Sequence, residues 1–232
     1  MAEVILALDL PGKAALRLLD RLPDVRWVKV GSILFVQEGP PLVRELVTRG
    51  LRVFLDLKWH DIPHTVAGAV EAAREMKVAL ATVHSLGGAA MLHAAQQAAG
   101  PDLGLLGVTV LTSHTAEGYA AALGRESVEL VREVERLAGL AGETGLRGVV
   151  CSPLEIVTAR KTLGPDRWIV VPGIRPAGSA TGDQARIAEP AAAARSGATH
   201  LVVGRPILEA QDPVAAFRAL SLAGLGASAA LP

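Results

Sequence analysis

The sequence is poor in aromatic side chains, cysteine and net charge. Phe, Trp and Tyr make up 3% of the 232 residues although half of all residues are hydrophobic, so the core must consist of Ala, Leu, Val and Ile. Cys151 is the only cysteine, which excludes an intrachain disulfide, and its apolar surroundings indicate a small core residue. The 23 basic and 23 acidic residues cancel, so no basic excess drives binding to a nucleic-acid backbone. Nucleic acid is therefore not expected as a partner.

Long apolar runs are also missing. No stretch approaches the ~20 apolar residues that a membrane-spanning helix needs. The amino-terminal MAEVILALDL has no basic leader and is interrupted by Asp9. We therefore expect a cytoplasmic protein with no membrane partner. No linker or low-complexity tract divides the chain, which predicts one catalytic domain over residues 1–220 and a flexible tail over the Ala-, Gly- and Ser-rich residues 221–232.

Eight short apolar runs rich in β-branched residues are typical of buried parallel strands. They are residues 4–10, 27–31, 51–58, 80–85, 103–111, 146–152, 168–174 and 200–204. The segments between them have helical spacing, as in residues 43–47 between Pro41 and Gly50. Alternating strands and helices predict an α/β fold, and eight repeats in this length favour a single-domain (β/α)8 TIM barrel. A Rossmann fold is disfavoured because the segment after the first run lacks the G-x-G-x-x-G pattern.

Charged residues stand where the first three predicted strands end, in strongly apolar surroundings. Asp9 ends the first and Lys29 lies inside the second. Asp56 and Lys58 lie two residues apart in the third, so their side chains should leave the strand on one face, and Asp61 follows in the next loop. One interpretation is a partly buried ion pair, which is costly unless each charge is well paired. The other is a fixed array in which carboxylates hold an ammonium group oriented to give a proton to a carbanion.

The second half of the chain carries a predicted phosphate site. In TIM barrels the site lies at the carboxyl ends of the strands, and phosphate often binds in the loops after strands seven and eight. PGIRPAGSATGDQ, residues 172–184, follows the seventh run and suits a mobile loop with free backbone N–H donors between Arg175 and Gln184. After the eighth run, Gly204 allows close backbone approach, and Arg205 offers a fork of donors that matches phosphate oxygens.

Several of these segments resemble one enzyme family. DLKWHDIPHTV, which begins at Asp56, is similar to the signature D-x-K-x-H-D-I-P-x-T-V of orotidine 5′-phosphate decarboxylase of the bacterial type. PGIRPAGSATGDQ and VVGRP resemble its phosphate loop and last strand, and LDL, KVG, VHSLGG and VTVLTS fall in the family's order and spacing. The resemblance implies decarboxylation of orotidine 5′-monophosphate to uridine 5′-monophosphate in de novo pyrimidine biosynthesis.

The resemblance also implies a role for each matching position. Lys58 would protonate C6 of the pyrimidine, Asp56 would lie beside the departing carboxylate, and Lys29 and Asp9 would bind the ribose. A homodimer is implied as well, because part of each site would come from the neighbouring subunit. The remaining implied roles are pyrimidine recognition by Thr112, phosphate binding by Arg175, Gln184, Gly204 and Arg205, and completion of the neighbouring subunit's site by Asp61 and Thr65.

The mechanism implied by this resemblance uses no cofactor and no metal. His60 and His64 have zinc-like spacing, but Pro63 between them disfavours a shared helical face, and His84 is expected to be a hydrogen-bonded barrel residue. Two alternatives stay open. D-x-K-x-x-D is shared with sugar-phosphate barrel enzymes that use a divalent metal and an enediolate, such as 3-keto-gulonate 6-phosphate decarboxylase or hexulose phosphate synthase. The other alternative is an inactive barrel that only binds nucleotides or serves in an assembly.

Overall fold

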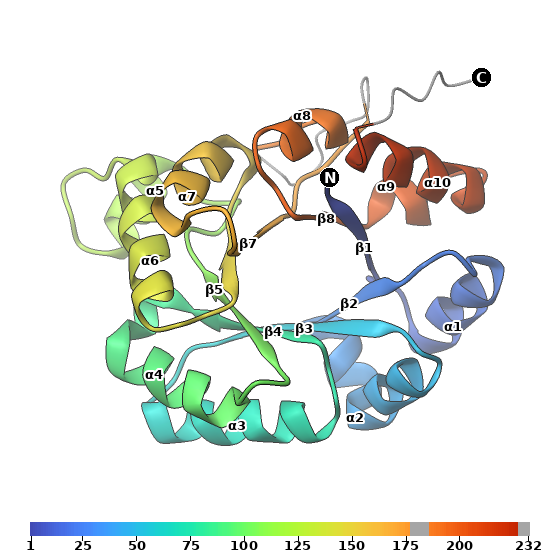
Figure 1. Cartoon of the computed structure of the whole chain (residues 1–232), viewed down its shortest axis with the longest axis horizontal. Helices are drawn as coiled ribbons and strands as arrows, with labels where there is room; N and C mark the ends of the chain where they lie inside the picture. The colour runs from blue at the N-terminus through green and yellow to red at the C-terminus, as the bar shows by residue number, and fades with distance from the viewer. Residues whose placement is uncertain (177–185, 227–232) are drawn as a thin grey trace.

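Eight parallel strands form a closed ring surrounded by helices in this computed structural model, which describes residues 1–176 and 186–226 (Figure 1). Each strand is hydrogen-bonded to the next one in the chain, and the eighth returns to pair with the first, where Glu3 lies opposite His200. Closure leaves no sheet edge open to another chain. The predicted (β/α)8 TIM barrel is confirmed.

All eight predicted strands form, although most are shorter than the apolar runs that predict them. The run 103–111, for example, contributes a strand of only five residues. The rest of such a run leaves the sheet and forms the wall of the barrel mouth. The strands are β1 (Glu3–Ala7), β2 (Trp27–Gly31), β3 (Arg52–Trp59), β4 (Leu80–His84), β5 (Gly104–Val108), β6 (Gly148–Val150), β7 (Trp168–Val171) and β8 (His200–Val203).

Helices connect the strands and cover the outside of the ring. The longest, α2, is interrupted at Gly39, whose φ of +64° is not helical, and Pro40 and Pro41 then begin its second part. The helices are α1 (Gly12–Arg21), α2 (Ser32–Thr48), α3 (Pro63–Glu75), α4 (Gly88–Ala99), α5 (Ala116–Ala122), α6 (Leu130–Glu143), α7 (Ile156–Leu163), α8 (Pro190–Arg195), α9 (Arg205–Leu208) and α10 (Pro213–Gly224), with short 3-10 turns η1 (Ser85–Gly87) and η2 (Pro153–Glu155).

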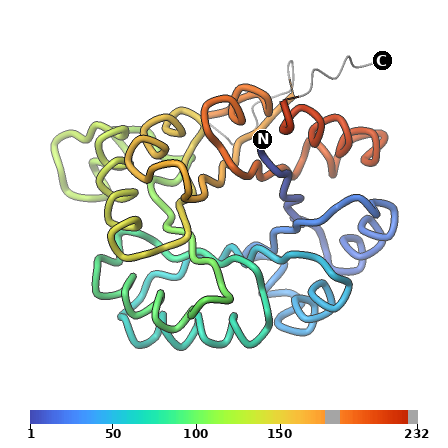
Figure 2. The backbone as a smooth tube through the Cα atoms, viewed as in Figure 1, coloured from blue at the N-terminus to red at the C-terminus, as the bar shows by residue number. Residues whose placement is uncertain are grey.

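The beginning of the chain lies against its last helix (Figure 2). The backbone N–H of Ala2 donates to the carbonyl of Gly224 at 2.9 Å, and Phe217 and Leu220 of α10 are buried. Helix α10 therefore continues to Gly224, inside the segment 221–232 that the sequence predicts as a tail. Residues 227–232 lie outside the described part of the chain.

Side-chain alternation along the strands divides the core into two layers. In β1, Val4 and Leu6 pack toward the helices, whereas Ile5 and Ala7 face the inside of the barrel. The layer between strands and helices is large and almost entirely aliphatic, as the composition predicts. The inner layer is small and consists of Ile5, Ala7, Trp27, Phe54, Leu80, Leu106, Val170 and Val202.

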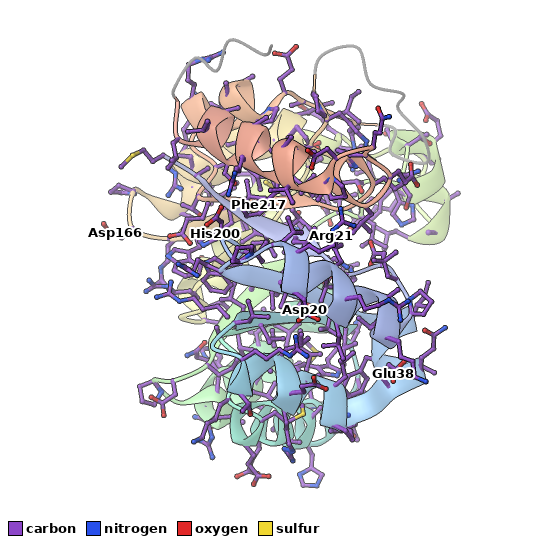
Figure 3. The ribbon with its side chains drawn as sticks, turned by 90° about the vertical axis from the view of Figure 1, so that its right-hand side faces the viewer. Asp20, Arg21, Glu38, Asp166, His200 and Phe217 are labelled. Carbon is purple, nitrogen blue, oxygen red and sulfur yellow. The ribbon has the colours of Figure 1, made fainter. Side chains whose placement is uncertain are left out.

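Two of the three tryptophans and His200 pack together at the amino end of the barrel. The ring centroids of Trp27 and Trp168 lie 5.8 Å apart, and those of Trp168 and His200 lie 4.3 Å apart. In the side view of Figure 3, His200 lies near one end of the barrel and Glu38 near the other. Because these rings fill the amino end, a ligand can enter the interior only at the carboxyl end, where active sites of this fold lie.

The sequence also carries expectations about membrane-spanning helices and about the single cysteine. Among the helices described, none combines the length and the hydrophobicity needed to cross a membrane. Cys151 is buried, and burial raises the pKa of its thiol, as is typical of a structural cysteine.

Candidate active site

Charged side chains reach the carboxyl end of the barrel by continuing the inward face of three strands. Asp9, Lys29 and Asp56 each come two residues after a member of the inner layer. Because side chains alternate along a strand, the residue two positions after an inward-facing one also points inward. The same periodicity that fills the barrel with apolar groups therefore delivers three charges to its mouth.

These side chains and Lys58 form a row of alternating charge. Lys29 Nζ lies 3.2 Å from Asp9 Oδ1 and 4.0 Å from Asp56 Oδ2, and Lys58 Nζ lies 2.9 Å from Asp56 Oδ1. The side chains of Lys29 and Asp56 are only 13% and 14% exposed. The carboxylate of Asp56 is thus held between two ammonium groups, in a partly buried place where opposite charges stabilise each other more than in water.

The end of β3, which carries this row, is irregular. The register with β4 shifts between Leu55 and Trp59, so that residues 56–58 lie opposite Thr82 alone. Lys58 has a φ of +53°, a left-handed conformation that costs a residue with a Cβ atom roughly 1–2 kcal/mol. The two charged side chains of β3 therefore meet through a bulge. The sequence correctly predicts that Asp56 and Lys58 lie close together, but a bulge brings them together and not the regular alternation of side chains along a strand.

A cavity of about 420 Å³ opens over the charged row and connects it with the second half of the chain. Beyond Asp9, Lys29, Asp56 and Lys58, residues after β5, β7 and β8 line it. A cavity of this volume lies in the range of small-molecule sites. The further residues of its lining include Thr112, Ser113, Arg175, Gly204 and Arg205. The two groups of residues that the sequence singles out thus face one space.

The beginning of the predicted phosphate loop is hydrogen-bonded to the chain that follows the loop. Arg175 N–H donates to the carbonyl of Ala188 at 3.0 Å, and Ala188 N–H donates to the carbonyl of Gly173 at 3.2 Å. Ile174 and Ala188 consequently form a short parallel bridge. Arg175 is 8% exposed and lines the cavity from this anchored position. Gln184 lies outside the described residues, so its predicted role stays a prediction.

Asp61 and Thr65 stand apart from the row of charges. Both are exposed, and neither lines the cavity formed by the described residues. Asp61 Oδ1 accepts a hydrogen bond from the backbone N–H of Ile62 at 2.6 Å. Within one chain, the fourth member of the charged row is therefore Asp9, while Asp61 stays at the surface beside the barrel mouth.

Two stacked histidines lie near Lys58. The rings of His60 and His84 are 5.4 Å apart at an interplanar angle of 23°. His84 Nδ1 accepts a hydrogen bond from the N–H of Leu86 at 3.3 Å, the role expected of a barrel histidine. Burial, together with the charges of His60 and Lys58, lowers the pKa of His84 to about 4. In the described part of the chain, no group of three or more His, Cys, Asp or Glu side chains is arranged to hold a metal ion.

Gly31 and Thr82 also shape the charged row, and the sequence analysis predicts no role for either of them. A Cβ atom at Gly31 would lie 2.9 Å from Lys29 Nζ, so glycine leaves the space that the ammonium group occupies. Thr82 is fully buried, and its hydroxyl contacts both Asp56 and the backbone of Lys58. Alternation could have revealed Thr82, because Leu80, two residues earlier, belongs to the inner layer. No sequence signal marks the close approach at Gly31.

Known proteins resemble this chain over almost its whole length. Residues 2–220 match the model of the Orotidine 5'-phosphate decarboxylase / HUMPS family. An orotidine 5'-phosphate decarboxylase of Anaeromyxobacter sp. (strain K) is 50% identical over 225 residues, which cover 96% of this chain and 98% of the relative. One of Opitutus terrae is 48% identical over 221 residues, covering 93% and 95%.

Similarity in structure agrees with the similarity in sequence. The crystal structure of orotidine 5'-phosphate decarboxylase from Lactobacillus acidophilus matches with a TM-score of 0.86 at 35% identity, covering 97% of this chain and 99% of that one. The resemblance drawn from the motifs is thereby confirmed. The chain belongs to the orotidine 5'-phosphate decarboxylase / HUMPS family.

Proposed function

We propose that this chain is a cofactor-independent carbon–carbon lyase that converts orotidine 5′-monophosphate to uridine 5′-monophosphate and carbon dioxide, a step of de novo pyrimidine biosynthesis. The family and the names of its relatives support this activity. One observation in the structure carries the proposal. Asp56 is held between the ammonium groups of Lys29 and Lys58 on one side of a cavity that Arg175 and Arg205 also line.

The charged row suits the difficult part of this reaction. When the bond between C6 and the carboxyl group breaks, the electron pair stays on C6, and no group in the ring accepts it. The barrier must then fall through fixed charges, which need little reorganisation in a site of low dielectric. In this proposal Asp56 lies beside the departing carboxylate and keeps the Lys58 ammonium oriented. Carbon dioxide leaves, and Lys58 Nζ delivers a proton to C6.

The other residues of the cavity would hold the substrate in place. Asp9 and Lys29, 3.2 Å apart, would bind the ribose hydroxyls, and Thr112 would read the pyrimidine edge. The phosphate lies far from C6, so its binding energy can be used to organise the reacting groups. The proposed phosphate ligands are Arg175, Gln184, Gly204 and Arg205.

We also propose that the active enzyme is a homodimer in which Asp61 and Thr65 complete the site of the partner. Their position outside the cavity of their own chain supports this arrangement. Ile33, Val36 and Ile62, at the start of α2 and directly before α3, are 76%, 83% and 64% exposed. Exposed apolar groups on neighbouring elements mark protein interfaces, and a second copy of the chain is the proposed occupant. The proposed location of the enzyme is the cytoplasm.

The test of the activity is a spectroscopic assay of orotidylate with EDTA present. Wild-type protein should consume the substrate, whereas a metal-dependent sugar-phosphate enzyme would leave it unchanged. Lys58→Ala should abolish turnover but retain binding of uridine 5′-monophosphate. Arg205→Ala should both weaken binding and slow the chemical step. A wild-type protein without activity would refute the proposal, and normal turnover of the Lys58 variant would remove Lys58 from the role of donor.

A further inference from the structure

Thr82 contributes an uncharged side chain that is hydrogen-bonded into the charged row. It lies in the middle of β4 and is fully buried. Its hydroxyl donates to Asp56 Oδ1 at 3.1 Å and accepts the backbone N–H of Lys58 at 2.9 Å. A hydroxyl has one proton to donate and two lone pairs, so this group can serve both partners at once.

The bulge in β3 explains why a side chain is needed here. Three residues, 56–58, lie opposite Thr82, and Lys58 adopts a left-handed backbone conformation. A strand in this shape cannot continue a regular ladder of backbone hydrogen bonds. The hydroxyl of Thr82 takes the N–H of Lys58 instead, and buried backbone donors require such a partner.

We propose that Thr82 is a positioning residue for the decarboxylation, an inference that rests on the proposed function. Its hydroxyl fixes the carboxylate that separates the two ammonium groups, and also the backbone from which the proton donor extends. Loss of the hydroxyl would leave Asp56 Oδ1 held by Lys58 alone and would remove a restraint on the strained backbone of Lys58. A small displacement of Lys58 Nζ from the reacting carbon is enough to slow proton delivery strongly.

The structure predicts that this effect falls on the chemical step. Arg175, Gly204 and Arg205 line the cavity from the segments after β7 and β8, whereas the hydroxyl of Thr82 bonds to Asp56 and to the backbone of Lys58. Substrate binding through the phosphate should therefore persist when the hydroxyl is removed. The expected signature is a lower kcat with a nearly constant KM.

Two substitutions separate the hydroxyl from the shape of the side chain. Thr82→Val keeps the shape and removes the hydroxyl, whereas Thr82→Ser keeps the hydroxyl and removes a methyl group. We expect kcat to fall at least about tenfold in the valine variant and to stay within about threefold of wild type in the serine variant. KM and the affinity for uridine 5′-monophosphate should change less than about threefold in both.

Thr109→Val is the matched control. Thr109 is also fully buried, and its hydroxyl donates to the carbonyl of Val150 at 2.9 Å, away from the charged row. Its replacement removes a buried hydroxyl of the same kind, so kcat should be retained. Equal losses of kcat in the two valine variants, or in the valine and serine variants at position 82, would overturn the positioning role.

A readout that does not depend on turnover separates this inference from the proposed function. Lys58 is 39% exposed, and its reaction with trinitrobenzenesulfonate can be followed by peptide mapping. The rate of modification at Lys58 should change at least about threefold in Thr82→Val but not in Thr82→Ser, because only the former loses the restraint. Active wild-type enzyme with no change in either readout would overturn the role of Thr82 alone. A changed modification rate in a protein that does not decarboxylate orotidylate would overturn the proposed function alone.

Discussion

Arg186 and Glu155 form an ion pair in which the two side chains are only 9% and 3% exposed. A second guanidinium nitrogen of Arg186 donates to the carbonyl of Leu111 at 2.9 Å, and Ser152 N–H donates to Glu155 Oε2 at 3.2 Å. Arg186 is the first described residue after the predicted phosphate loop, and Leu111 immediately precedes Thr112. One buried pair therefore fastens the chain beyond that loop to the wall that carries the proposed pyrimidine contact.

Breaking this pair should cost considerable stability. Glu155→Gln leaves the charge of Arg186 buried without its counter-ion, and we expect the free energy of unfolding to fall by about 3 kcal/mol or more in urea titrations. Glu129→Gln is the control, because Glu129 pairs with Arg132 at the surface, where the two side chains are 63% and 80% exposed. That change should stay within about 0.5 kcal/mol. Equal effects of the two substitutions would contradict the prediction.

Gly31→Ala should lower activity without unfolding the protein. The backbone at Gly31 has φ −92° and ψ 178°, which alanine adopts without strain, but the added Cβ atom would lie 2.9 Å from Lys29 Nζ. The flexible end of Lys29 must then move from its place between Asp9 and Asp56. We expect kcat to drop about tenfold or more. Gly68→Ala in α3 is the control, since nothing lies within 4 Å of its Cβ position; it should leave kcat unchanged.

The stability of the fold should decrease on mild acidification because of His200. Burial is the main cause of the lowering of its pKa to about 4, and the charges of Arg52 and Arg147 act in the same direction against that of Glu3. Between the ordinary value of 6.5 and about 4, the unfolded chain binds a proton that the folded chain does not. The stabilisation is thus complete above pH 6.5 and is lost as the pH falls through this range.

Substitution of His200 should reduce this pH dependence. We expect the loss of unfolding free energy between pH 7 and pH 4.5 to be about 2 kcal/mol smaller in His200→Gln than in wild type. Urea titrations at the two pH values give the difference directly. His93→Gln, at an exposed position of α4, controls for the loss of an imidazole. An unchanged pH dependence in the His200 variant would show that other groups cause the loss.

The proposed dimer can be tested by mixing two inactive variants. Lys58→Ala removes the proton donor from the site of its own chain. Asp61→Asn removes a carboxylate from the site of the partner chain. A mixed dimer then contains one doubly defective site and one intact site. Equal amounts of the two variants, unfolded and refolded together, should recover about a quarter of wild-type activity, since half of the dimers are mixed and half of their sites are intact. Recovery of none would place Asp61 in the site of its own chain.

The sequence predicts the barrel well because its strands are separate apolar runs with one inward and one outward face. It also predicts which side chains share the cavity, since Asp9, Lys29 and Asp56 continue the inward face and Arg175 and Arg205 follow the last two strands. Alternation along each strand is a local property, and the sequence reports it directly.

What the sequence does not reveal depends on how distant segments pair. The bulge in β3 is defined by its register with β4, so neither the left-handed backbone of Lys58 nor the role of Thr82 is visible in the signature motif. The space beside Gly31 depends on the rotamer of Lys29. Arg186 lies just beyond the conspicuous loop motif, and its partner Glu155 is 31 residues away.

The aromatic rings at the amino end of the barrel limit how substrate and products can enter and leave. Trp27 and His200 are only 2% and 4% exposed, so their packed rings close the amino end of the barrel. In the proposed reaction the nucleotide, the carbon dioxide and the proton that recharges Lys58 all pass through the carboxyl end of the barrel. Uridine 5′-monophosphate must therefore dissociate before the next substrate molecule can bind.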